Sequence, residues 1–546
     1  MHLNFGLQNN WKSCDIRNQT ATMRGRNYLR PILGIAILLV LIKISITLIE
    51  PWAGRKIEKA VNSQGGNFNI EIGTVHFRIF RSGIDLEKIT VHSNQEPITD
   101  RNFHGQIASA RFNGISLARL IVKNDVNISE VIISDIRFAG NIPPSRKSAT
   151  ILAPSPIKIG SIQFDKINLA LTKADSKQSY TLEGGSFKVY DLKIAEKDSM
   201  TIKLIRQFDF GADALGSVSA DSLYTHKARG LDYSTTSHTL KADSLLILPN
   251  YSDYLFTARS AYQSDRIEAV FTGLLFHNLP FEDFLGSASL ISTFIEIGKM
   301  DIRVFRDQRK EFRHVTKTTF QDLIYRYPGY IRIDSILVAD GNILYTAHAP
   351  KANEPGHISF NDLHARLFKI TNDTVYKTEK AFMELHANAL LMGKGKLSVF
   401  LKSKLYDHRN SFSLTGNLAS MDAEKLNPIL EKNAFIFVTS GTIDAMKFGF
   451  LANNEKATGN MTLLYHGLDL ALKNKRTDDT TGLVERIKSF FVNRNLSVSN
   501  PLPGKGIRTG VIDYDRDPER FLFSYCFKSI LSGMKSSLAK KRRRNS

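Results

Sequence analysis

Apolar and polar residues alternate with a period of two over most of the chain after residue 67. At the start of this region Phe68, Ile70 and Ile72 alternate with Asn69 and Glu71. Successive side chains of a strand point to opposite faces, so this pattern predicts strands with one apolar and one polar face. Later segments repeat it between Gly, Asn, Asp and Ser residues: 128–138, 187–194, 240–248, 267–276, 397–401, 412–418, 435–438 and 461–470. The sequence therefore predicts a mainly β protein built on antiparallel sheet.

Residues 31–49 do not follow this pattern, because they are almost entirely apolar with Lys43 as their one charged residue. A helix of that length is roughly 28 Å long, close to the thickness of a bilayer's hydrocarbon core. Three arginines precede the segment, and no small-residue cleavage site follows it. The excess of cations before the span predicts a single-pass anchor with residues 1–30 in the cytoplasm and residues 50–546 outside. The alternative interpretation is a buried core helix.

A pattern of four apolar positions recurs along the predicted strands. Two apolar residues two apart are followed, after a step of three, by two more in 70–77, 157–164, 295–302 and 331–338. Each step contains a residue that tolerates a positive φ: Gly73, Gly160, Gly298 or Asp334. We expect a bulge or tight turn at these residues, which would return the second apolar pair to the face of the first.

The same pattern predicts which side chains face inward. We expect six isoleucines to line one apolar interior: Ile70, Ile72, Ile157, Ile159, Ile331 and Ile333. The charged residues between them, Glu71, Lys158 and Arg332, should face outward, since neighbours along a strand point to opposite faces.

The C-terminal region changes to a helical period. We expect an amphipathic helix from Asp517, as N-cap, to Ala539, with Pro518 in its first turn. One stripe of this helix is apolar: Phe523, Phe527, Leu531, Met534 and Leu538. Five cations follow at 540–544, so the stripe has two interpretations. It either packs against the end of the sheet or contacts a membrane or a membrane-bound partner.

Charge and cysteine content narrow the possible partners. The 546 residues carry a formal net charge of +20, much of it at the two ends of the chain. The basic residues do not form a clustered patch within a nucleic-acid-binding motif, so we do not expect nucleic acid as a partner. Basic ends suit anionic lipid surfaces better. Cys14 and Cys526 would lie on opposite sides of the membrane, which excludes a disulfide within one chain.

No residue pattern predicts catalysis. The 14 histidines are scattered, and residues 504–510 match neither a dinucleotide-binding nor a P-loop fingerprint. A nucleophile elbow of the Gly-x-Ser-x-Gly type is also absent from the sequence. We therefore expect a protein that is not an enzyme, with no catalytic, cofactor or metal-binding residues.

Several segments resemble the AsmA-like family of bacterial envelope proteins. The resemblance lies in the predicted anchor with residues 60–77, then in 83–91, 416–430, 440–448 and 457–470. The segment 416–430 is similar to a strand, short helix and Leu-Asn-Pro step of that family. These motifs are structural, and residues 200–400 match only in their strand pattern.

The resemblance implies a fold and a division of the chain. The family is related to bridge-like lipid-transfer proteins with a repeating β-groove. It implies an elongated, curled antiparallel sheet with an apolar groove, a few short helices and the C-terminal amphipathic helix. The divisions would be a cytoplasmic tail at 1–30, a transmembrane helix at 31–49, a periplasmic AsmA-like β-groove at 50–475, and C-terminal strands with the helix and basic tail at 476–546. Roughly 20 to 27 strands would make a groove on the order of 100 to 130 Å long.

The function implied by the resemblance is lipid handling in a two-membrane envelope. Anchored in the inner membrane, the protein would shield phospholipid acyl chains and contribute to outer-membrane lipid transport or homeostasis. An outer-membrane or other envelope protein is a possible partner. The alternative is a structural or assembly factor for outer-membrane biogenesis that carries no lipid. A polysaccharide-processing enzyme is disfavoured, because no acid–base pair is recognisable.

Overall fold

A computed structural model describes most of the chain after the predicted anchor. The described residues are 43, 50–59, 62, 68–78, 81–93, 103–115, 126–142, 156–173, 176–194, 205–280, 287–377, 381–472 and 497–539. The predicted cytoplasmic tail, the basic residues 540–544 and, apart from Lys43, the predicted anchor at 31–49 lie outside them. Among the residues the structure describes, no helix combines the length and the apolar character needed to cross a membrane.

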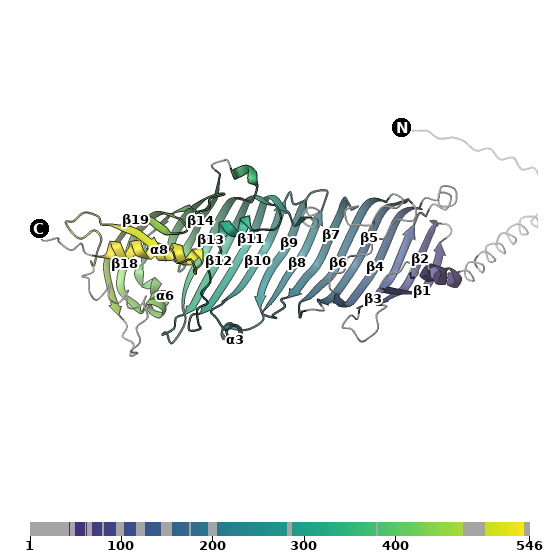
Figure 1. Ribbon diagram of the computed structural model, residues 1–546, viewed down its shortest axis with the longest axis horizontal. Helices are drawn as coiled ribbons and strands as arrows, with labels where there is room; N and C mark the ends of the chain where they lie inside the picture. Colours follow the sequence, from purple (N-terminus) through teal and green to yellow (C-terminus); the bar gives the residue numbers. More distant parts are fainter. Residues whose placement is uncertain are drawn as a thin grey trace, which may run out of the picture.

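One sheet of 20 strands makes up the molecule, and its strands stand side by side along an elongated body (Figure 1). In chain order they are β1 (Phe68–Arg78), β2 (Gly83–Ser93), β3 (Phe103–Asn113), β4 (Val126–Ile142), β5 (Ile157–Lys173), β6 (Ser179–Ile194), β7 (Gln207–Val218), β8 (Tyr224–Ser234), β9 (Thr239–Pro249), β10 (Asp265–His277), β11 (Leu290–Asp307), β12 (Ile331–His348), β13 (Gly356–Thr371), β14 (Phe382–Leu391), β15 (Gly395–Lys404), β16 (Phe412–Leu418), β17 (Met421–Asp422), β18 (Ile436–Ala452), β19 (Lys456–Leu472) and β20 (Thr509–Asp515). The predicted mainly β class is confirmed.

The strands pair in the order of the chain. Each strand from β1 to β15 pairs with the next, and β16 then pairs with β18, β18 with β19, and β19 with β20. The short β17 also pairs with β18. Every pairing is antiparallel except β4 with β5 and β11 with β12, which are parallel. At about 4.8 Å per strand the sheet is roughly 90 Å long, slightly shorter than the length expected from the sequence.

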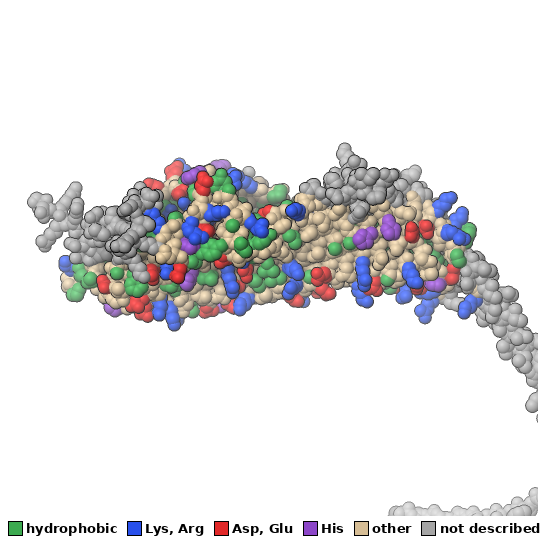
Figure 2. Space-filling view, turned by 90° about the horizontal axis from the view of Figure 1, so that it is seen from below, with side chains coloured by type: hydrophobic (Ala, Val, Ile, Leu, Met, Phe, Trp, Pro, Cys, Tyr) green, Lys and Arg blue, Asp and Glu red, His purple; other side chains and the backbone are tan. Residues whose placement is uncertain are grey.

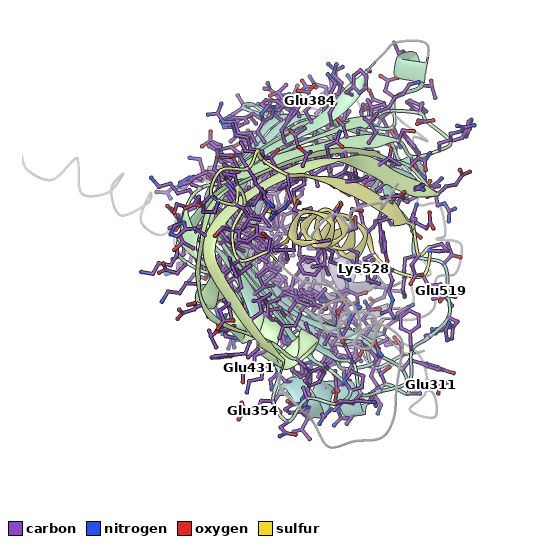
Figure 3. All side chains as sticks on the ribbon, turned by 90° about the vertical axis from the view of Figure 1, so that its left-hand side faces the viewer. Glu311, Glu354, Glu384, Glu431, Glu519 and Lys528 are labelled. Atoms are coloured by element: carbon purple, nitrogen blue, oxygen red, sulfur yellow. The ribbon has the colours of Figure 1, made fainter. Side chains whose placement is uncertain are left out.

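The sheet is curled about its long axis. Viewed from its C-terminal end it forms an incomplete ring, and α8 (Leu522–Leu538) lies inside that ring (Figure 3). We call the concave side that holds α8 the trough. Residues 50–59, before β1, are helical. The helical elements that follow are short: α3 (Asp253–Ala258), α5 (Phe320–Tyr325), η3 (Thr374–Lys377), η4 (Ala423–Leu426), α6 (Asn427–Ile429) and η5 (Leu430–Ala434).

The start of the C-terminal helix differs from the prediction. The helix begins at Leu522 rather than after Asp517. The Asp517 side chain accepts a hydrogen bond from the Glu519 backbone N–H at 3.0 Å, so it caps a single turn only. The Pro518 carbonyl accepts a hydrogen bond from the Lys317 N–H at 2.8 Å. This long-range contact holds the segment before α8 in a non-helical path.

The break in the ladder that we expected within the repeated pattern is present, but the residue with the positive φ lies in the antiparallel partner strand. In each case the residue directly opposite the Gly or Asp of the pattern has a positive φ. These two residues do not form a pair in the ladder, although the residues on both sides of them do. The four cases are Lys88 opposite Gly73, Asp191 opposite Gly160, Gly273 opposite Gly298, and Lys369 opposite Asp334. The prediction that the Gly or Asp of the pattern itself takes the positive φ is therefore wrong. A residue in the partner strand can supply the same local break in the ladder.

Side chains cover the free edge of the first strand. The Asn62 amide donates to the Ile70 carbonyl at 2.9 Å and accepts from the Ile70 N–H at 2.8 Å. The Glu50 carboxylate accepts from the Phe77 N–H at 3.0 Å. These groups occupy positions that another strand would otherwise fill, so they protect the edge from pairing with a second sheet.

Candidate functional site

An unbroken row of apolar residues crosses the sheet from β1 to β18. Directly opposite residues in neighbouring strands share a face of the sheet, so the ladder register defines the row. Its members are Val75, Leu86, Ala110, Ile133, Phe164, Phe187, Phe210, Tyr233, Leu240, Phe276, Ile295, Ile336, Leu367, Leu385, Leu401, Leu414 and Phe450. Each is buried or half-buried. We call this set the apolar row. It makes one apolar surface that runs nearly the length of the molecule.

A second row, in which Leu215 and Leu245 are exposed, begins at one of the predicted lining residues, Ile70. It continues through Val91, Gly105, Phe138, Leu169, Leu182, Leu215, Ala228, Leu245, Phe271 and Met300. Ile72 starts a shorter run through Ile89, Ile107, Ile136 and Ile167. Sequence reasoning identified the first members of these rows. It missed the rest, because the register that joins them is set by pairing between distant strands.

The other predicted lining residues lie in two separate places. Ile157 and Ile159 are half-buried on β5, and Ile159 pairs with Leu192 of β6. Ile333 is buried on β12, in a core cluster against which Ile331 packs. The structure thus brings the six isoleucines into different stretches of one sheet rather than into a single pocket. Their role in contacting lipid stays a prediction.

The alternation predicted for these strands is present. Glu71, Lys158 and Arg332 are exposed, whereas the isoleucines beside them are buried or half-buried. Figure 2 shows Lys, Arg, Asp and Glu side chains along one long edge of the molecule, with hydrophobic side chains gathered over its C-terminal half.

An apolar cavity of about 530 Å³ lies in the trough near the C-terminal end of the sheet. Its walls come from the inner side of β10 to β13, from the short helices η4, α6 and η5, from β18 and β19, and from α8. A volume of this size falls within the range of 300–1,000 Å³ that is usual for small-molecule sites. The cavity walls include Ile343, Tyr345, Leu426, Val438 and Leu463.

All five residues of the predicted helical stripe line this cavity: Phe523, Phe527, Leu531, Met534 and Leu538. Phe523 also reaches the opposite wall, where its ring centroid is 6.2 Å from Tyr345 and 6.4 Å from Phe360. Phe523 remains 53% exposed and Phe527 41% exposed. The stripe faces into the trough, and it leaves large aromatic surfaces uncovered there by described residues.

A different face of α8 docks on the sheet, and the sequence analysis missed it. Tyr525, Ser529, Gly533 and Ser537 are buried at intervals of four residues. A Cβ added to Gly533 would lie 2.7 Å from Ile512, which shows how closely the helix approaches β20. The recurrence of small residues every four positions was the available signal, and by itself it does not identify which face of a helix is buried.

Side chains of α8 also accept hydrogen bonds from backbone N–H groups at the last edge of the sheet. The Ser532 hydroxyl accepts a hydrogen bond from the Asp513 N–H at 3.2 Å, and the Ser536 hydroxyl accepts one from the Val511 N–H at 3.0 Å. Both donors belong to β20, whose other side pairs with β19. Thus α8 replaces a further strand and ends the sheet.

Residues 308–319, which we call the strap, connect β11 to α5 and contact the β10 side of the ring. The Gln263 side chain donates to the carbonyls of Gln308 at 3.1 Å and Lys310 at 3.0 Å. The Gln263 N–H donates to the Glu311 carbonyl at 2.9 Å. Three hydrogen bonds from one residue therefore fix the beginning of the strap.

The far part of the strap contacts the segment that leads into α8. The Lys317 N–H donates to the Pro518 carbonyl at 2.8 Å, and His314 Nδ1 lies 2.9 Å from a Glu519 carboxylate oxygen. Figure 3 places Glu311 and Glu519 on the same side of the ring, where the sheet itself is open. The strap thus spans the opening of the trough beside the cavity.

Two cations in the cavity wall have different surroundings. Arg306 forms a paired contact with Asp265, at 2.6 Å from Nε and 2.5 Å from the second guanidinium nitrogen. Burial lowers the pKa of Arg306, but the hydrogen bonds and charge of Asp265 outweigh it and the pKa is raised. Burial lowers the pKa of Lys528, and the nearby Arg520 lowers it further. Figure 3 shows Lys528 inside the ring.

Neither metal ligands nor known relatives define this site further. Among the described residues no group of His, Cys, Asp or Glu side chains is arranged to hold a metal ion. The arrangement offers apolar surface, a cavity and a cation. Comparisons with protein-family models and with curated proteins found no match to this chain. The likeness to the AsmA-like family therefore remains a prediction from the sequence motifs.

Proposed function

We propose that this protein is an envelope protein, anchored in the inner membrane by residues 31–49, that shields phospholipid acyl chains in its trough. It would contribute in this way to lipid transport to the outer membrane or to lipid homeostasis there. The observation that carries the proposal is the apolar row, which is continuous over 17 strands.

The physical basis is the free energy of keeping hydrocarbon away from water. Removing apolar surface from water is favourable by about 25 cal/mol per Å². A chain moving along the apolar row would exchange one apolar contact for the next, so no single step would need to hydrate the whole chain. The polar headgroup could remain in water at the open side of the trough, because the curled sheet forms an incomplete ring (Figure 3).

A second candidate function is a structural or assembly factor for outer-membrane biogenesis. The observation that favours it is the position of α8, which occupies the trough at the C-terminal end and lines the cavity there together with the sheet and the short helices. A filled trough would serve as a rigid surface for an envelope protein partner. The two candidates differ in one property, since only the first requires lipid to be bound along the open strands.

Mass spectrometry of molecules that co-purify with the full chain distinguishes the two candidates. The shielding function predicts bound phospholipid, and a charge at the half-buried Ile159 should reduce it. Asn168→Asp is the matched control, because Asn168 is exposed on the same strand β5. Loss of lipid in Ile159→Asp but not in Asn168→Asp, with both proteins folded, would support shielding. Equal lipid recovery from both variants would favour the assembly factor.

The proposed topology has its own test. Alkaline phosphatase is active only when it reaches the oxidising side of the inner membrane, so a fusion after Asn62 should be active. An inactive fusion, or a mature protein that begins after residue 49, would contradict an anchor at 31–49.

A further inference from the structure

We propose that the cavity between α8 and the inner side of the curled sheet is a binding site for one anionic amphiphile, with Lys528 as the contact for its charged group. The ligand class is a hydrocarbon chain that carries a carboxylate or a phosphate. This inference rests on the proposed function, because it names the ligand that the trough would hold at its C-terminal end. It adds to that function a preference for negatively charged ligands at the C-terminal end of the trough.

The apolar part of the ligand would contact the stripe of α8. Phe527, Leu531 and Met534 line the cavity from the helix, and Ile343 and Tyr345 line it from β12. Burial raises the pKa of the Tyr345 hydroxyl. Such a surface binds hydrocarbon and disfavours a polar ligand that lacks a long apolar chain.

Lys528 differs from the other cations of the cavity wall. Arg306 is already paired with Asp265, whereas no ion pair found among the described residues includes Lys528. Its ammonium group lies 5.9 Å from the centre of the Tyr514 ring. Lys528 is half-buried beside the stripe and lines the cavity. The described residues therefore provide no anion in ion-pair contact with Lys528, and a ligand could supply one.

The charges around Lys528 also favour the binding of an anion beside it. Burial and the charge of Arg520 disfavour its protonated form, and Asp517 only partly opposes them. A bound carboxylate or phosphate would stabilise the ammonium group by a charge-assisted hydrogen bond. Lys535 also lines the cavity, about two turns further along the same helix, and would add positive potential on that side.

Native mass spectrometry of the full chain in detergent tests this site. The probes are oleate and its uncharged methyl ester, which share one hydrocarbon chain. We expect oleate to bind about tenfold more tightly than the ester, as a single charge-assisted hydrogen bond would give. Lys528→Gln should remove this preference, and Lys528→Arg should keep it. Lys447→Gln is the matched control, because Lys447 is exposed on β18.

The results separate the inference from the function on which it rests. Equal binding of oleate and the ester by the unaltered protein would overturn charge selection and leave acyl-chain shielding intact. A preference that persists in Lys528→Gln would overturn the role of Lys528, and so would an equal loss of both probes. Absence of binding to either probe would contradict the cavity site and the shielding function together.

A second pair of probes identifies the source of the anion. Phosphatidylglycerol and phosphatidylcholine differ in net charge but both have two acyl chains. A Lys528-dependent preference for phosphatidylglycerol would assign the site to a phospholipid. A preference for oleate with no discrimination between the phospholipids would assign it to a fatty acid. The absence of a Lys528-dependent preference in both pairs would overturn the proposal.

Discussion

Strands β5 and β18 have the same length and the same alternating pattern, but they differ in burial. Each is 17 residues long. No residue of β5 is fully buried, and its apolar residues are half-buried apart from the exposed Ala170. Seven residues of β18 are buried, among them Val438 at 2% exposure and Phe450 at 4%.

The difference lies in what covers the two strands. Over β18 the structure places η4, η5 and α6 on one side of the cavity and α8 on the other. Over β5 the described residues include no such helix. The same strand pattern thus makes a closed core at one end and an open apolar surface at the other. We infer that the open surface is the part available to acyl chains, and that the closed end fixes the curl of the sheet.

The largest expected effect is on the free energy of unfolding, when one and the same substitution is made at two positions of the apolar row. Phe450→Asp in β18 should lower the free energy of unfolding by about 4 kcal/mol or more, because it removes a buried ring and introduces an unpaired charge. Phe164→Asp in β5 should cost about 1–2 kcal/mol, since Phe164 is only half-buried. Urea unfolding of both variants measures the two values. Equal costs would remove the distinction between a closed end and an open surface.

A smaller effect is expected where α8 meets β20. A Cβ at Gly510 would lie 2.4 Å from the Gly533 carbonyl oxygen and 2.2 Å from the Ser537 hydroxyl. Gly510→Ala should therefore destabilise the C-terminal end by about 1–3 kcal/mol through overpacking. Gly506→Ala is the control, because a Cβ there would meet nothing within 4 Å. If both substitutions were neutral, the close docking of α8 would be refuted.

Removing one edge hydrogen bond should have a still smaller effect. Ser536→Ala deletes the hydroxyl that accepts from the Val511 N–H, and we expect a loss of about 0.5–1.5 kcal/mol. Hydrogen exchange at the Val511 amide should accelerate, while exchange at residues of β16 stays unchanged. An unchanged rate at Val511 would show that α8 does not protect this edge.

The smallest expected change concerns the only cysteine among the described residues. Burial raises the pKa of Cys526 to about 12, so the thiol is protonated at pH 8 and should react slowly with iodoacetamide. A Cys14→Ser background isolates the signal. If α8 stays docked, anionic vesicles will leave the rate unchanged. Faster labelling with vesicles, reversed by salt, would instead support the interpretation that the stripe leaves the trough to contact a membrane.

Local patterns in the sequence predicted much of the fold. The segment predicted at 412–418 coincides with β16, and the five-residue stripe of the C-terminal helix lies on one side of α8, as expected. These features depend on the period of side chains along one element, which the sequence contains directly. The predicted outward positions of Glu71, Lys158 and Arg332 follow for the same reason.

Features that depend on distant contacts could not be predicted. The parallel pairings of β4 with β5 and of β11 with β12 join strands whose register no local pattern specifies. The helix begins at Leu522, after a segment that is bound through Pro518 to Lys317 of the strap, more than 200 residues away in the chain. The cavity, and Lys528 in its wall, exist only once α8 is placed inside the ring.

Photo-crosslinking along β5 tests the central claim most directly. A benzoylphenylalanine at Phe164, in the apolar row, and another at Asn168, on the exposed face, would be irradiated in native membranes and analysed by mass spectrometry. A trough that carries acyl chains predicts phospholipid adducts at position 164 and none at 168. Adducts at neither position, or equally at both, would contradict it.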